Sequence, residues 1–265
     1  MSQPSAIITV MAMAAKKAAL GLVKDFGEID KLQVSQKGPA DFVSAADLRA
    51  DETLRRELSR ARPQYNLVTE ESEAKPLDPD QPTFYVDPLD GTTNFLHAIP
   101  HFCISIGLVE KEQPVAGVIY DPIKDELFWA ERGCGAFVND HRMRVSSRTQ
   151  LNQALLATGI PFKGSRGVER VARFSKQLSN VADHIAGIRR MGAAALDLAY
   201  TAAGRYEAYW EEGCFPWDLA AGIVMVREAG GMVSELDGRD RVLHGESIFA
   251  SNGHFHDSLR KRLVG

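Results

Sequence analysis

The sequence predicts a layered α+β fold, because its helical and strand-like segments come in blocks. Residues 102–145 contain short β-rich runs separated by charged or Gly/Pro breaks, a pattern typical of an antiparallel meander. Helical stretches lie on either side of this run, without the regular strand–helix–strand alternation of a dinucleotide-binding fold. Neither G-x-G-x-x-G nor G-x-x-x-x-G-K-[ST] occurs in the chain, so the phosphate loops of those folds are not expected.

The composition is that of an ordinary globular protein with one large or two small domains. The chain has 265 residues, of which 45% are hydrophobic and 25% charged. The net charge of −4 leaves no basic footprint, so we expect no direct binding to nucleic acid. Three cysteines are too few for a disulfide framework or a zinc site, and we expect buried free thiols in a reducing cytosol.

The first element is a helix expected near residues 5–26. Its apolar stretch is short and is interrupted by Lys16 and Lys17, which does not fit a targeting or membrane-spanning segment. We interpret it as an amphipathic helix of the folded body. The protein is therefore expected to be soluble and cytoplasmic, with no membrane partner.

The next elements lead to the first acidic motifs. A polar loop, QKGPADFVSAAD, precedes a helix expected at 45–61, and its Ser44 and Asp47 form a capping-box-like pair. A short buried strand at 66–71 ends in two glutamates. After a surface loop, a second strand is expected at 83–87.

A second half begins near residue 151. The expected elements are, in order, a strand in ALLATGI, a helix near 167–180, the segment IRRM, a small-residue helix GAAALDLAYTAAG, a strand YEAYW, a helix WDLAAGIVMVREAGG, further strands and a last helix. We expect an N-terminal half, 1–150, that carries metal-binding motifs, and a C-terminal half, 151–265, that completes the active site.

The segment DPLDGTTNF, residues 87–95, concentrates the polar groups. Pro88 is expected to break the strand and force a turn, so that Asp87 and Asp90 face one point. The turn also deprives the Leu89 carbonyl of a ladder partner. Carboxylates, a carbonyl oxygen and water are the ligands that Mg²⁺ requires. A divalent cation would also relieve the repulsion within such a cluster.

The residues after Asp90 resemble a helix start that could hold phosphate. Free backbone N–H groups in the segment Gly91-Thr92-Thr93-Asn94 would form an anion site, and its hydroxyls would add donors. Further carboxylates occur in TEE at 69–71 and at Asp218, where a first-turn position would favour the ionised form. Metal ligands beside a phosphate site predict a metal-dependent phosphatase with metal-bound water as nucleophile.

Two segments, DPLDGTTNF and WDLAAGIVMVREAGG, closely resemble the signatures of the inositol monophosphatase family, which are lithium-sensitive, Mg²⁺-dependent phosphomonoesterases. The resemblance covers nearly the whole chain in order, including KGPADFVSAAD, VTEES, FCISIGLVEKEQPVAGVIYDP and RRMGAAALDLAYTAAGRYEAYWEEGCFPWD. It implies a layered αβαβα sandwich and a homodimer. It also implies in-line attack of metal-activated water on a phosphate monoester.

The resemblance also implies roles for individual residues, with two to three Mg²⁺ ions. The first ion would be held by Glu70, Asp87 and the Leu89 carbonyl, and the second by Asp87, Asp90 and Asp218. Glu70 would also help to hold a third ion, which gives it a catalytic role.

Other positions match catalytic and substrate-binding positions of the family. Thr92 and Asp47 would orient and deprotonate the nucleophilic water. The substrate contacts would come from Asp90, Gly91, Thr92, Gly192, Ala193, Ala194, Glu211 and Asp218. Of these, the Gly91 and Thr92 amides would hold the phosphate, and Glu211 with the Gly192–Ala194 backbone would hold ring hydroxyls.

The identity of the alcohol stays open at this stage. The leading hypothesis is hydrolysis of myo-inositol monophosphate. Histidinol phosphate or another small phosphomonoester is the alternative, because Glu211 could pair with a cationic amine. Some bacterial relatives also bind the transcription machinery, so an added regulatory protein-binding role is a further alternative. Arg189 and Arg190 could serve such a partner, support a dimer interface, receive substrate phosphates or form a solvated or salt-bridged pair.

Overall fold

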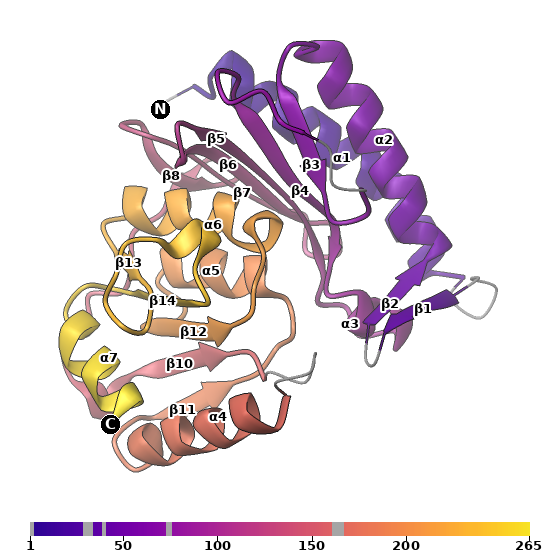
Figure 1. The fold of residues 1–265 in the computed structure, drawn as a ribbon. Coiled ribbons are helices and arrows are strands. Elements are labelled where there is room, and N and C mark those ends of the chain that lie inside the picture. Colours follow the sequence, from indigo (N-terminus) through magenta and orange to yellow (C-terminus); the bar gives the residue numbers. More distant parts are fainter. Residues whose placement is uncertain (1–2, 29–33, 39–40, 73–75, 161–166) are drawn as a thin grey trace.

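Five alternating layers of helices and sheets make up the protein (Figure 1). The computed structural model describes residues 3–28, 34–38, 41–72, 76–160 and 167–265. Helices α1 and α2 cover one face of the larger sheet, α5 and α6 fill the space between the two sheets, and α4 and α7 cover the smaller sheet. The expected layered αβαβα sandwich is confirmed.

The larger sheet has seven strands that follow one another in chain order from β3 to β9. Only the β3–β4 pair is parallel, and the other neighbours are antiparallel, as a meander requires. The strands are β3 (Asn66–Thr69), β4 (Thr83–Asp90), β5 (Cys103–Glu110), β6 (Gln113–Asp121), β7 (Glu126–Glu131), β8 (Gly135–Val138) and β9 (His141–Arg142).

The smaller sheet has the order β11-β10-β12-β14-β13 and mixes parallel and antiparallel pairs. Its strands are β10 (Leu155–Thr158), β11 (Gly187–Arg189), β12 (Ala208–Glu212), β13 (Met232–Ser234) and β14 (Ser247–Ser251). The helices are α1 (Ala6–Phe26), α2 (Ala45–Ala61), α3 (Thr92–Leu96), α4 (Gly167–Ala182), α5 (Ala194–Ala202), α6 (Pro216–Glu228) and α7 (His256–Val264).

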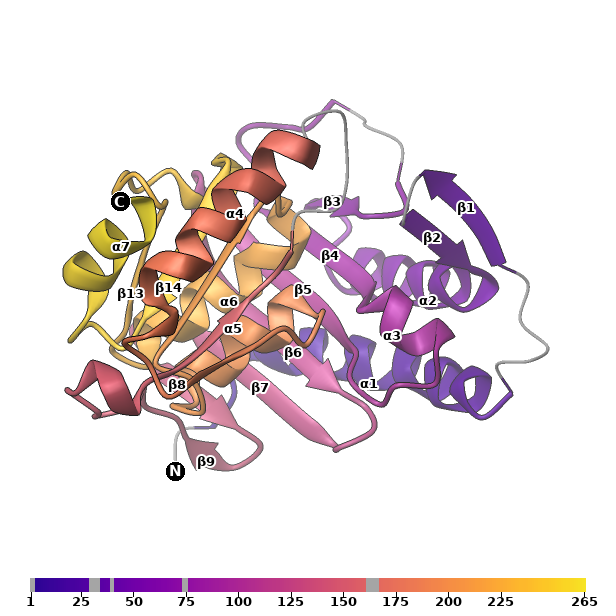
Figure 2. The ribbon, with the colours of Figure 1, turned by 90° about the horizontal axis from the view of Figure 1, so that it is seen from below.

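One expected loop contains strands. The segment QKGPADFVSAAD was expected to be irregular, but β1 (Val34–Gly38) and β2 (Asp41–Ser44) form an antiparallel pair there. The pairing satisfies backbone N–H and C=O groups that a polar loop would leave to water. The pair lies beside α3 and α2 (Figure 2).

Helix α1 is the one described helix that is long and apolar enough to cross a membrane by composition alone. It packs against α2 and against β6, and it buries Ile8, Met11 and Leu22. One face of α1 therefore contributes to the core, as expected for an amphipathic helix of the folded body.

Helix α6 approaches the larger sheet closely because small residues face each other. A Cβ atom on Gly107 of β5 would lie 2.4 Å from the Cβ of Ala220, and one on Gly117 of β6 would lie 2.7 Å from the Cα of Ala221. These glycines set the distance between α6 and the sheet. The first turn of α6, which carries Asp218, is thereby held over the sheet.

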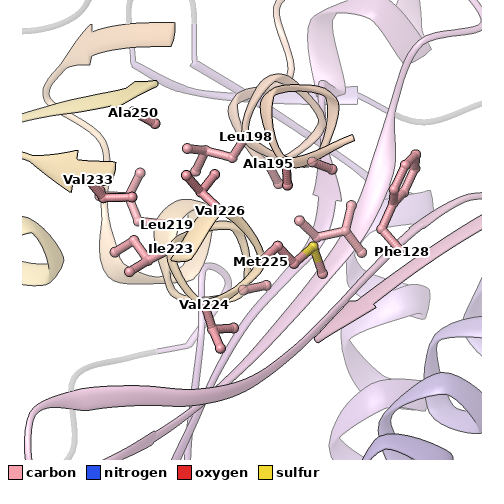
Figure 3. Close-up of a cluster of buried hydrophobic side chains, with 14 of the residues drawn as sticks. Phe128, Ala195, Leu198, Leu219, Ile223, Val224, Met225, Val226, Val233 and Ala250 are labelled. Atoms are coloured by element: carbon pink, nitrogen blue, oxygen red, sulfur yellow. The ribbon is translucent and has the colours of Figure 1, made fainter. Parts of the chain in front are cut away.

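The core between the sheets is continuous from one sheet to the other (Figure 3). Leu198 of α5 and Leu219 and Ile223 of α6 are at most 1% exposed. They pack with Phe128 of the larger sheet and Ala250 of the smaller one in the same cluster. Because α5 and α6 contact both sheets, the expected division into halves 1–150 and 151–265 remains a prediction.

The three cysteines are free, as expected, although not all are buried. Cys103 is buried and Cys214 is partly buried, whereas Cys134 is exposed. Cys134 lies in the turn between β7 and β8, where the chain leaves the core.

Candidate active site

Strand β4 carries the first two carboxylates without ending between them. Asp87 pairs with Ser105 and Asp90 with Cys103, and the register shifts between these two pairs. The expectation that the strand stops at Asp87 is therefore wrong: a bulge at Pro88 and Leu89 takes the place of a full turn. A bulge tolerates proline, which has no N–H to donate to the ladder.

The bulge still brings Asp87 and Asp90 into one buried region. Asp87 is 2% exposed and Asp90 is 8% exposed. Asp87 accepts a hydrogen bond from the Leu89 N–H at 2.9 Å. Asp90 accepts one from the Ala195 N–H at 2.8 Å, which ties the start of α5 to the motif.

Glu70 and Asp218 reach the same region from other elements. The Glu70 N–H donates to the Val86 carbonyl at 3.0 Å, so Glu70 follows β3 directly beside Asp87. Ser105 of β5 donates its hydroxyl to the Trp217 carbonyl at 3.1 Å, which fixes the residue before Asp218. The carboxylate of Asp218 accepts the Phe215 N–H at 2.7 Å and caps α6.

These carboxylates oppose one another's ionisation. Burial raises the pKa of Asp87 well above its usual value, and the charges of Glu70, Asp90 and Asp218 raise it further. Burial also raises the pKa of Asp90 to about 7. The expected benefit of the helix dipole to Asp218 is outweighed, because burial and then the charge of Asp90 raise its pKa well above the usual value.

The donor set fits a hard divalent cation. In the described part of the chain, no three His, Cys, Asp or Glu side chains already converge into a group that could hold an ion. Mg²⁺ keeps several waters among its ligands, so the carboxylates need not converge into a closed cage before it binds. The mutual repulsion of the buried carboxylates is the electrostatic condition that a bound cation relieves.

Asp47 and Thr92 are hydrogen bonded, as the proposed water-orienting pair requires. Thr92 Oγ1 lies 3.1 Å from Asp47 Oδ1 and 3.0 Å from the Leu89 carbonyl oxygen. The other oxygen of Asp47 accepts the Ser44 N–H at 2.9 Å and the Ser44 hydroxyl at 2.5 Å, which completes the predicted capping box. Burial raises the pKa of Asp47, against the lowering effect of these hydrogen bonds.

Gly91 begins the short helix α3, as expected. Its φ of 96° is in the left-handed region, and a Cβ there would lie 3.0 Å from the His101 carbonyl oxygen. Only glycine fits this position without strain. The first N–H groups of α3 have no partner within the helix by geometry, which leaves them available to an anion.

Glu211 and Glu212 differ sharply in their surroundings. Glu211 accepts a hydrogen bond from the Tyr209 hydroxyl at 2.6 Å. Burial raises the pKa of Asp90, and the negative charge of Glu211 raises it further. Glu212 instead accepts hydrogen bonds from Arg173 at 2.8 Å and from Gln177 at 3.0 Å, both on α4. Glu211 is therefore the glutamate that is oriented toward the carboxylate cluster.

The Gly192–Ala194 segment also lies beside the motif. Asn94 of α3 donates its amide to the Met191 carbonyl and to the His101 carbonyl, both at 2.8 Å. Gly192 and Ala194 are partly exposed, whereas Ala193 is fully buried, so any contact from Ala193 would have to come from its backbone. Arg189 and Arg190 are exposed just before this segment.

Several residues that shape the site were missed in the sequence. Asn94 ties α3 to Met191, and Tyr209 orients Glu211. A Cβ on Gly159 would lie 1.9 Å from the carboxyl carbon of Glu211, so glycine is required there while that carboxylate keeps its place. The alternation of β12, which places Tyr209 and Glu211 on one face, was a usable signal for Tyr209.

Comparison with known proteins identifies the family. The model described as "Inositol monophosphatase family" matches residues 4–264. The chain belongs to the inositol monophosphatase family. The inositol-1-monophosphatase of Caulobacter vibrioides is 50% identical over 256 residues, which are 96% of this chain and 99% of that protein.

Two further members of the inositol monophosphatase family carry other names. The crystal structure of extragenic suppressor protein suhB from Bartonella henselae superposes on this protein with a TM-score of 0.92. The two sequences are 50% identical, and the match covers 98% of each chain. The Nus factor SuhB of Escherichia coli K12 is 40% identical over 247 residues, which are 93% of this chain and 91% of that protein. Family membership makes the chain a phosphatase, and the predicted enzyme class is confirmed.

Proposed function

We propose that this phosphatase hydrolyses myo-inositol monophosphate to inositol and phosphate in a reaction that requires two to three Mg²⁺ ions. The observation that carries the proposal is the group of four acidic residues, Glu70, Asp87, Asp90 and Asp218. Burial, together with the charges of this group, raises the pKa values of the three aspartates beside the hydrogen-bonded Asp47–Thr92 pair.

The residues divide between holding metal and holding phosphate. Glu70, Asp87 and the Leu89 carbonyl would hold one ion, and Asp87, Asp90 and Asp218 a second. Bound Mg²⁺ would supply an activated water and neutralise the phosphate charge. The Gly91 and Thr92 N–H groups would bind phosphate oxygens at the start of α3.

The Asp47–Thr92 pair would accept the proton of the attacking water. Thr92 Oγ1, 3.1 Å from Asp47 Oδ1, donates to that carboxylate and keeps a lone pair for a water. Because Ser44 occupies the other oxygen of Asp47, Oδ1 stays aimed at Thr92. A proton can then move from water to Thr92 and from Thr92 to Asp47.

Glu211 would select the alcohol. Its Oε2 accepts the Tyr209 hydroxyl at 2.6 Å, which orients the carboxylate, and this carboxylate would accept a hydrogen bond from a ring hydroxyl. The Gly192 and Ala194 backbone, together with that of Ala193, would complete the contacts. A neutral polyol suits this site better than an alcohol with a second phosphate, which Glu211 would repel.

A phosphate-release screen tests this assignment. The substrates are inositol 1-phosphate, histidinol phosphate, fructose 1,6-bisphosphate and 3′-phosphoadenosine 5′-phosphate, each with Mg²⁺. We expect inositol 1-phosphate to have the highest kcat/KM, and a large preference for histidinol phosphate would overturn the inositol assignment. Glu211→Gln should lower kcat/KM for the best substrate, whereas the control Glu212→Gln should not.

A regulatory protein-binding role is the second candidate. A relative that is 40% identical over nearly the whole chain carries the name Nus factor. Such a partner could use the exposed Arg189 and Arg190, whose roles remain proposals. Binding of transcription proteins by a catalytically inactive Asp90→Asn variant would support this second role, and absence of binding by both forms would exclude it.

The expected setting of the enzyme is that of a soluble cytoplasmic homodimer without nucleic-acid or membrane partners. The support is the family membership, the net charge of −4 and the packing of α1 within the fold. Li⁺ is expected to inhibit. Light scattering of the purified protein tests the dimer, since a monomeric mass would refute it.

A further inference from the structure

Helix α2 contacts the active-site region through Asp47 and again through Arg55. Of these two residues, only Asp47 has a role in the proposed reaction. Two turns after Asp47, Arg55 reaches toward the end of β3. Its Nε donates to Asp51 Oδ2 at 2.7 Å, and its Nη2 donates to the Thr69 hydroxyl at 2.9 Å. Thr69 is 1% exposed and directly precedes Glu70.

The turn that Arg55 contacts is closed by its own hydrogen bonds. The Thr69 N–H donates to Ser72 Oγ at 2.9 Å, and the Ser72 hydroxyl donates to the Thr69 carbonyl at 2.8 Å. The hydroxyls of Thr69 and Ser72 lie 3.3 Å apart. With the Glu70 N–H bonded to the Val86 carbonyl, the backbone of Glu70 is fixed from both sides.

The guanidinium of Arg55 is itself held in place. Asp51 is buried and lies one helical turn before Arg55, so the pair has the i,i+4 geometry of a helix surface. The Arg55 side chain is only 32% exposed. A planar guanidinium can serve both acceptors at fixed angles, which a lysine ammonium cannot do equally well.

We propose that Arg55 is a positioning residue that sets the place of Glu70 through the Thr69 hydroxyl and so tunes Mg²⁺ affinity. The inference rests on the proposed metal-binding role of Glu70. Through Arg55 and Asp47, a single rigid helix would then align the end of β3 with Thr92. Neither Arg55 nor Thr69 touches substrate in this account.

Mg²⁺ binding measured by calorimetry tests the inference apart from catalysis. Arg55→Met keeps the length of the side chain and removes its donors, and we expect Mg²⁺ affinity to fall about 10-fold, as is usual for residues that orient metal ligands. The turnover at saturating Mg²⁺ should change less than about 2-fold, because the ligands themselves remain. Arg55→Lys should restore part of the affinity.

Two further variants separate positioning from simple stabilisation. Thr69→Val removes the accepting hydroxyl but keeps the backbone hydrogen bonds of the turn, and its loss of affinity should not add to that of Arg55→Met. Arg56→Met is the matched control, since Arg56 is exposed on the same helix and donates from Nε to Glu57 Oε1 at 3.4 Å. It should bind Mg²⁺ as the wild type does.

The outcomes are distinguishable. If Arg55→Met and Thr69→Val melt at lower temperatures in EDTA yet bind Mg²⁺ with wild-type affinity, Arg55 is only structural and the inference is overturned. If the wild type itself binds no Mg²⁺, both the inference and the proposed function are overturned. Weaker binding by both variants, with Arg56→Met unchanged, supports the inference.

Discussion

Replacing Asp90 by asparagine should make the metal-free protein more stable. The side chain keeps its shape, and its carbonyl oxygen can still accept the Ala195 N–H that Asp90 accepts at 2.8 Å. The substitution removes the charge whose burial raises the pKa of Asp90 to about 7. A metal-binding carboxylate of this kind stabilises the protein only when its cation is present.

The size of the effect follows from the pKa. A rise from 3.8 to about 7 means that ionising Asp90 costs the folded state about 4 kcal/mol at pH 8. Because the pKa of Asp90 is raised in the folded state, its contribution to stability is fully present below pH 3.8. This contribution is lost as the pH rises through about 7. Asp87 and Asp218 still repel each other in the variant, so the destabilisation of the cluster is only partly removed. For a chain of this length, we expect an increase in Tm of about 5–10 °C at pH 8.

Thermal unfolding in EDTA at pH 8 and pH 4.5 measures this difference. The advantage of Asp90→Asn should be large at pH 8 and small at pH 4.5, where Asp90 is already mostly protonated in the folded wild type. Added Mg²⁺ should raise the Tm of the wild type more than that of the variant.

A second buried aspartate provides the control. Asp121 is fully buried, but its carboxylate accepts N–H groups of Ile123 and Lys124 at 3.0 Å and the Lys124 ammonium at 2.5 Å. Asp121→Asn should therefore lower the Tm. If Asp90→Asn also lowers the Tm in EDTA at pH 8, the reasoning about repulsion in the cluster is refuted.

Three further predictions concern the proton acceptor, the alcohol site and acid stability. Thr92→Val should lower kcat about 100-fold. The double variant with Asp47→Asn should have a kcat only slightly lower, because the two groups act as one unit, and additive losses in steady-state kinetics would contradict this. Gly159→Ala should displace the Glu211 carboxylate and lower kcat/KM for inositol 1-phosphate about 10-fold, with little change in Tm. An unchanged kcat/KM would argue against the proposed contact between Glu211 and a ring hydroxyl. Burial lowers the pKa of His101 from 6.5 to about 4, so its protonation costs the folded state about 1–2 kcal/mol between pH 7 and pH 5, opposite in sign to the effect of the buried carboxylates. In urea unfolding, the wild type should therefore lose about 1–2 kcal/mol of stability relative to His101→Gln over this range, and parallel pH profiles of the two proteins would assign the acid sensitivity elsewhere.

The parts of the site that lie close together in the chain were predictable. Asp87, Asp90, Gly91 and Thr92 lie within six consecutive positions, and elementary chemistry connects such carboxylates with a metal and such a helix start with an anion. The capping box of Ser44 and Asp47 was also readable from spacing. Glu211 could be chosen over Glu212 only through the family resemblance, and its contact with Tyr209 now gives a physical reason.

The contacts between distant segments could not be predicted. Asp90 and Ala195 are 105 residues apart, and nothing local in either segment indicates their hydrogen bond. The bulge at Pro88 depends on pairing with β5, because a proline alone fits a turn or a bulge equally well. Gly159 lies where a Glu211 carboxylate from another strand must fit, a steric condition that exists only in the folded state.

The central claim is that Asp90 and its neighbours hold Mg²⁺ for phosphate-ester hydrolysis. The most direct measurement is the initial rate of phosphate release from inositol 1-phosphate as Mg²⁺ is titrated, in the wild type and in folded Asp90→Asn. We predict that the wild-type rate rises from zero in EDTA to saturation and that the rate of the variant is lower by more than about 100-fold. A wild-type rate that persists in EDTA, or a variant that turns over like the wild type, would contradict it.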